Sequence, residues 1–191
     1  MAVILMTLAL ITCGKGIQGK GINSVIGPYT AFVERFYNCQ PDNRPLPWTW
    51  NLRVTHFNPY KPKELQRLTG NVTATLGTFD DSCWFKVILD TRSNNQWKEN
   101  AFVFNFIKNG CRALKDNAPG YYEQVLKKRE VKGACCFKPG VYEVNNASVD
   151  WSFPNVPILP YGRYRVRAMF GKADDDYTCS VADARIVPKS D

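Results

Sequence analysis

The chain has 191 residues, of which 45% are hydrophobic and 13% aromatic, and its formal net charge is +8. This composition is too apolar for a disordered protein, and the length suits one domain with its own hydrophobic core. The basic residues are scattered along the sequence, which argues against a nucleic-acid-binding protein.

Residues 1–14 read MAVILMTLALITCG, an uncharged apolar run followed by Lys15 and Lys20. The apolar core of this run is shorter than the roughly 20 residues that span a bilayer. It is typical of a secretory signal peptide with cleavage between residues 14 and 16, and a buried N-terminal strand is the alternative. We therefore expect a secreted, extracellular protein whose single domain covers residues 17–191.

Alternation between apolar and polar residues predicts β-strands in most of the chain, because successive side chains of a strand point to opposite faces. In chain order, the apolar rows are Trp48–Trp50–Leu52–Val54–His56, Val72–Ala74–Leu76, Phe85–Val87–Leu89, Phe102–Phe104–Phe106 and Tyr164–Val166–Ala168–Phe170. A last strand is indicated by Tyr177, Cys179, Val181, Ile186 and Val187. Polar clusters such as Ser93–Asn94–Asn95 and Asp174–Asp175–Asp176 predict the turns between the strands.

Only residues 111–131 have a helical pattern, with a candidate buried face of Leu114, Tyr122, Val125 and Leu126. Pro119–Gly120 divides this segment in two. The predicted fold class is therefore mainly β, an antiparallel two-sheet sandwich or β-cup with one short helical segment.

The mature domain keeps six cysteines: Cys39, Cys83, Cys111, Cys135, Cys136 and Cys179. An even number in an oxidising compartment predicts three disulfides, and the adjacent Cys135 and Cys136 are expected to take different partners. The sequence has no C-x-x-C motif and a single histidine, His56, so no metal or other cofactor is expected. Sequons at Asn71 and Asn146 predict N-glycosylation.

The C-terminal half carries a longer ordered pattern, which comprises Phe102–Phe106, Cys111–Leu114, Cys135–Tyr142, Val149–Pro154 and Pro157–Val166. This order resembles the ML lipid-recognition superfamily, with the closest likeness to its ganglioside-activator branch and to the insect chemosensory CheB proteins. The likeness covers residues 102–187, with Phe36–Cys39 as an N-terminal anchor, whereas residues 58–100 match only in their strand rhythm.

The resemblance implies a β-cup around an apolar cavity that binds one lipid or another hydrophobic small molecule, without catalytic groups. It also implies that Cys39 pairs with Cys179 and that Cys111 pairs with Cys135 or Cys136. Cys83 then takes the remaining cysteine of that adjacent pair, with Cys136 as its expected partner when Cys111 takes Cys135.

Ten residues are the candidate ligand contacts. Eight are expected in the cavity wall, namely Trp48, Trp50, Phe85, Val87, Phe104, Phe106, Tyr164 and Val166, and two at its rim, Trp151 and Phe153. A solid core is the alternative explanation for the inward aromatic residues. Arg163, Arg165 and Arg167 lie on the opposite face of their strand, where a solvated surface is favoured over contact with an anionic head group or a membrane surface.

The expected function is that of a secreted, non-enzymatic binder of a lipid or hydrophobic small molecule, since no G-x-S-x-G or H-E-x-x-H motif is present. The CheB likeness implies a chemosensory role in gustatory or pheromone perception. The alternatives are a glycolipid-presenting activator of a partner enzyme and a β-sandwich module that binds a protein such as a receptor. An empty apolar volume between the sheets distinguishes a ligand carrier from a module with a filled core.

Overall fold

The computed structural model describes residues 25–39, 45–131 and 134–189. The expected signal peptide and its cleavage site lie outside these residues. The strands are β1 (Ile26–Gly27), β2 (Tyr29–Asn38), β3 (Trp48–Val54), β4 (Gln66–Ala74), β5 (Phe79–Asp80), β6 (Trp84–Ser93), β7 (Gln96–Phe106), β8 (Cys136–Phe137), β9 (Gly140–Val149), β10 (Leu159–Pro160), β11 (Gly162–Lys172) and β12 (Asp175–Pro188). Between β7 and β8 lie α1 (Gly110–Asn117), α2 (Pro119–Val125) and a 3₁₀ turn, η1 (Lys127–Arg129).

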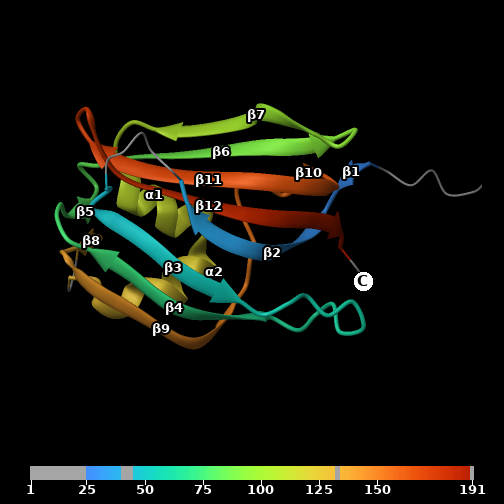
Figure 1. Cartoon of the computed structure of the whole chain (residues 1–191), viewed down its shortest axis with the longest axis horizontal. Helices are drawn as coiled ribbons and strands as arrows, with labels where there is room; N and C mark the ends of the chain where they lie inside the picture. The colour runs from blue at the N-terminus through green and yellow to red at the C-terminus, as the bar shows by residue number, and fades with distance from the viewer. Residues whose placement is uncertain (1–24, 40–44, 132–133, 190–191) are drawn as a thin grey trace, which may run out of the picture.

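Two antiparallel sheets form the body of the described structure (Figure 1). The larger has five strands in the order β2-β12-β11-β6-β7, and the smaller has three in the order β3-β4-β9. Two short ribbons, β1–β10 and β5–β8, complete the pairing. The helices lie behind the strands in Figure 1, with α1 in contact with β6 and α2 in contact with β9. The predicted fold class, a mainly β protein of antiparallel sheets, is confirmed.

The helical prediction is confirmed together with its interruption. Pro119 is the first residue of α2, a position where a proline costs no helical hydrogen bond. The four residues of the expected buried face, Leu114, Tyr122, Val125 and Leu126, are all buried. They pack into a core with residues of the three-stranded sheet such as Leu68 and Val144.

The two sheets meet along β2 and β3, where side-chain amides replace a regular backbone ladder. The carboxamide of Gln66 accepts from the Val33 N–H (2.8 Å) and donates to the carbonyls of Val33 (2.8 Å) and Thr55 (2.6 Å). The carboxamide of Asn38 contacts both the N–H (2.9 Å) and the carbonyl (3.3 Å) of Trp50. We call this line of contacts the seam, and it closes one side of the cup.

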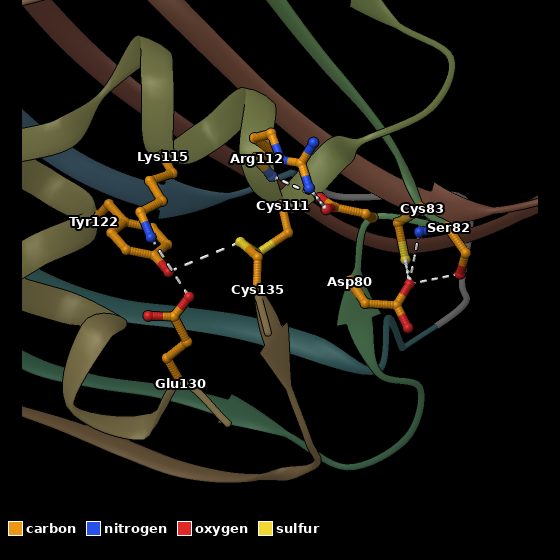
Figure 2. The surroundings of a disulfide bond; sticks show 10 residues. Asp80, Ser82, Cys83, Cys111, Arg112, Lys115, Tyr122, Glu130 and Cys135 are labelled. Carbon is orange, nitrogen blue, oxygen red and sulfur yellow. Dashed lines mark hydrogen bonds and ion pairs between the residues drawn. A yellow bond between two sulfur atoms is a disulfide. The ribbon is translucent and has the colours of Figure 1, made fainter. Parts of the chain in front are cut away.

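Two disulfides join distant parts of the chain. Cys39–Cys179 connects the end of β2 to β12 across 140 residues of sequence. Cys111–Cys135 connects α1 to the segment before β8 and lies beside the side chains of Tyr122 and Lys115, as Figure 2 shows. Both pairs agree with the pairing that the resemblance implies.

The expected third disulfide, between Cys83 and Cys136, is absent, and both residues are free thiols. Cys136 is adjacent to Phe137, which is completely buried. Since neighbouring side chains of a strand point to opposite faces, Cys136 points away from the core in which Cys83 is enclosed. The Cys83 thiol instead donates to the carbonyl of Thr78 (3.3 Å), and burial raises its pKa.

Candidate ligand cavity

The inner face of the five-stranded sheet forms one wall of an apolar cavity. Strand alternation points one row of each strand into it. The rows are Thr178, Ser180, Ala182, Ala184 and Ile186 on β12, Tyr164, Val166, Ala168 and Phe170 on β11, Phe85, Val87 and Leu89 on β6, Phe104 and Phe106 on β7, and Tyr29, Ala31, Val33 and Phe36 on β2. The wall thus draws on every strand of this sheet.

Small side chains in the middle of this wall create the space. Ala168 of β11 lies opposite Ser180 of β12 in the strand register, and Ala182 and Ala184 continue the same face of β12. We call these four residues the small-residue patch. A strand interior of this kind normally carries large β-branched or aromatic side chains, so the patch leaves volume that the surrounding phenylalanines do not fill.

The opposite wall comes from the helices and one loop. It comprises Leu114, Asn117 and Ala118 at α1, Tyr121 of α2, and Trp151, Phe153 and Val156 of the loop 150–158. The three-stranded sheet contributes only Trp50. The expectation of a cavity enclosed directly between two sheets is therefore corrected, because the helices and the loop separate the smaller sheet from the cavity.

The cavity has a volume of about 200 Å³. Pockets for drug-sized ligands usually measure about 300–1,000 Å³, whereas an engineered apolar cavity of about 150 Å³ binds benzene. This volume therefore suits a compact apolar molecule or one end of a longer chain.

Loop 150–158 is held over the cavity by two side-chain hydrogen bonds. The Tyr29 hydroxyl donates to the carbonyl of Val156 (2.7 Å), and the Asn155 amide donates to the Asn117 side-chain oxygen (3.2 Å). Burial is the main cause that raises the pKa of Tyr29 to about 12. The phenol therefore stays protonated and continues to hold the loop at neutral pH.

Four aromatic rings line the helical end of the cavity. Trp151 lies between Phe36 of β2 and Tyr121 of α2, with ring-centroid distances of 5.9 Å and 6.2 Å. Tyr121 in turn lies 6.0 Å from Trp50 of β3. This row connects the loop, the helix and both sheets.

The close approach of α2 to the loop depends on Gly120. A Cβ atom at this position would lie 2.1 Å from the carbonyl oxygen of Asp150. We expect Gly120→Ala to lower the free energy of unfolding by about 1–3 kcal/mol through overpacking, although alanine is the better helix former. Thermal and urea unfolding measure this, with Gln124→Ala on the exposed side of α2 as the control. An unchanged or higher stability of the glycine variant would contradict the packing described here.

Nine of the ten predicted contact residues line the cavity: Trp50, Phe85, Val87, Phe104, Phe106, Trp151, Phe153, Tyr164 and Val166. Trp48 does not. Its indole N–H donates to the Gly77 carbonyl (3.2 Å), and its ring packs against Phe170 and Tyr142 in the core. His56, at the end of the same predicted row, is exposed beyond the last residue of β3.

The apolar rows predicted from sequence include Ala168 of the small-residue patch but not the three members on β12, Ser180, Ala182 and Ala184. The sequence predicts the last strand from Tyr177, Cys179, Val181, Ile186 and Val187. Of these only Ile186 faces the cavity, which otherwise receives Thr178, Ser180, Ala182 and Ala184 of β12. The period-two spacing of these small residues is present in the sequence. Small and polar side chains do not form an apolar row, so this spacing alone does not predict an inward face.

The three arginines of β11 lie on the outer face and each has a carboxylate partner. Arg163 lies 3.7 Å from Glu34, Arg165 lies 3.9 Å from Asp183, and Arg167 lies 2.8 Å from Asp90. These carboxylates neutralise much of the positive charge of the three arginines. An ordinary solvated strand face, the favoured interpretation, has paired charges of this kind.

The two sequons differ in accessibility. Asn146 of β9 is exposed, whereas Asn71 of β4 is half-buried, and its side-chain oxygen accepts from Asn51 (3.4 Å) and Thr73 (3.3 Å). Asn146 is therefore the more accessible position for a glycan.

No family profile matches the chain, and no curated protein matches it by sequence. Among the described residues, none of the helices is both long and apolar enough to cross a membrane.

Proposed function

We propose that this protein is a secreted, non-enzymatic binder of a lipid or another hydrophobic small molecule, of the ML type that its C-terminal pattern resembles. The observation that carries the proposal is the apolar cavity, which side chains from all five strands of the larger sheet surround but do not fill. The alternative of a protein-interaction module requires a filled core, so the unfilled volume favours the carrier. The two disulfides support an oxidising, extracellular location.

Binding in such a cavity is driven by transfer of apolar surface out of water. Each buried methylene contributes about 0.8 kcal/mol, which corresponds to about a fourfold gain in affinity. The CheB likeness suggests a chemosensory ligand such as a pheromone or cuticular lipid, and the ganglioside-activator likeness suggests a glycolipid presented to an enzyme. Both assignments are part of the proposal and share the same cavity.

The test is to secrete the protein from eukaryotic cells and to compare its native and denatured masses, followed by displacement of N-phenyl-1-naphthylamine by hydrophobic compounds. Ala182 lies in the small-residue patch, opposite Val166 in the strand register. We expect Ala182→Leu to occupy the cavity and weaken probe binding about tenfold or more, the equivalent of losing about two methylenes of burial.

The matched control is Ala101→Leu, which adds the same atoms at an exposed position on β7. We expect this control to bind like the unaltered protein. Equal binding by both variants, or no binding by the unaltered protein, would contradict the proposed function and favour a module that acts through its surface.

A further inference from the structure

Most polar side chains around the cavity are already engaged with other protein groups. The Tyr164 hydroxyl donates to the Pro160 carbonyl (2.7 Å). The Thr178 hydroxyl donates to the Trp48 carbonyl (2.9 Å) and accepts from the Trp50 indole (2.6 Å). Tyr29 and Asn117 are held by the contacts of loop 150–158. The hydroxyl protons of Tyr29, Tyr164 and Thr178 are therefore already used within the protein, and Ser180 carries the remaining hydroxyl of the β12 row.

Tyr121 and Trp151 differ from these groups. Within the described residues, the Tyr121 hydroxyl makes no hydrogen bond, and the Trp151 indole N–H is buried without a partner. Their rings are stacked, with centroids 6.2 Å apart. An unpaired buried donor is rare in native structures and costly, so the Trp151 N–H, beside the unpaired Tyr121 hydroxyl, indicates a missing acceptor at this end of the cavity.

The Tyr121 hydroxyl is the member of this pair that a ligand reaches. Tyr121 is deeply enclosed by protein, and burial raises its pKa well above the usual value. It nevertheless keeps accessible surface and lines the cavity. A hydroxyl on the cavity-facing part of this surface would present an O–H donor to a ligand.

The other residues that line the cavity indicate whether the acceptor atom of the ligand is charged. None of the cavity-lining residues is Lys, Arg, His, Asp or Glu. Burial of a carboxylate without a cationic partner is strongly unfavourable, whereas a neutral hydroxyl, ester or ketone oxygen is satisfied by one or two donors.

We propose that the ligand is a neutral, oxygen-bearing hydrocarbon, such as a long-chain alcohol, ester or ketone, whose oxygen binds the Tyr121 hydroxyl at the helical end of the cavity. This inference rests on the proposed function. A cavity of this kind selects against free fatty-acid anions and against plain hydrocarbons.

The test uses the full secreted chain and compares displacement of N-phenyl-1-naphthylamine by 1-octanol, octane and octanoate at pH 7. Tyr121→Phe removes only the hydroxyl. We expect it to weaken 1-octanol binding about fivefold and to leave octane binding unchanged, as loss of one hydrogen bond implies. We expect octanoate to bind more weakly than 1-octanol to the unaltered protein.

Two matched variants control for other hydroxyls of the same cavity. Tyr164→Phe removes a hydroxyl already bonded to Pro160. Ser180→Ala removes a small hydroxyl from the small-residue patch. We expect neither variant to change the ratio of 1-octanol to octane affinity.

The outcomes separate the two proposals. An unchanged ratio in Tyr121→Phe, a change in Ser180→Ala instead, or octanoate binding as tight as that of 1-octanol overturns the assignment of the ligand oxygen while leaving the carrier function in place. Failure of the unaltered protein to bind either 1-octanol or octane overturns the proposed function itself.

Discussion

Replacement of both Cys39 and Cys179 by serine is expected to lower the free energy of unfolding by about 5 kcal/mol. The chain-entropy relation gives this value for a closed loop of about 140 residues, the separation of the two cysteines in sequence. The bond joins the end of β2 to the neighbouring strand β12. On its other side, β2 is held by the seam.

Urea unfolding of the double variant measures this loss, and the double variant at Cys111 and Cys135 is the comparison. That bridge closes only 24 residues, for which the same relation gives about 3.5 kcal/mol. We expect removal of the bridge that closes the longer loop to lower the free energy of unfolding more. A larger loss of stability in the Cys111/Cys135 double variant would contradict this order. It would indicate that this bridge stabilises the packing around the helices by more than the length of its loop implies.

The second large effect is expected at the seam. Gln66→Leu preserves most of the side-chain volume but removes three hydrogen bonds, which leaves the N–H and carbonyl of Val33 and the carbonyl of Thr55 without this partner. Because a buried polar group without a partner costs about 1–3 kcal/mol, we expect a loss of about 4 kcal/mol in the free energy of unfolding.

Hydrogen exchange at the Val33 amide gives an independent measurement of the same contact. We expect this amide to exchange much faster in Gln66→Leu, and to remain protected in Gln96→Leu, a control at an exposed position on β7. A loss below about 1 kcal/mol, the value of one ordinary hydrogen bond, would mean that the Gln66 contacts contribute little to holding the sheets together.

Strand segments with uninterrupted alternation were predictable from sequence, whereas β2 and β9 were not, because a bulge interrupts the alternation of each. On β2 the cavity receives Val33 and then Phe36, because the register shifts between them and the inward face changes parity. On β9 the buried residues are Tyr142 and Val144 before the irregularity, then Val149 after it, with Asn146 at positive φ. One extra residue in a strand reverses the alternation, so neither segment showed a continuous apolar row.

The cavity wall was largely predictable because large inward aromatic residues stand out against polar neighbours. The error at Trp48 has a different origin. Trp48 and Trp50 share one face of β3, and alternation cannot tell which part of that face meets the cavity. The position of α2 decides which of the two tryptophans meets the cavity, since Tyr121 contacts Trp50. This tertiary contact has no signal in the local sequence.

The small-residue patch sets the volume of the cavity independently of the pairing of the strands that carry it. Ala168 and Ala182 belong to long strands whose pairing relies on backbone hydrogen bonds, so exchanging their side chains alters what fits inside without altering how the strands pair. Single substitutions at these positions of β11 and β12 therefore change the volume of the cavity one side chain at a time while the sheet keeps its register.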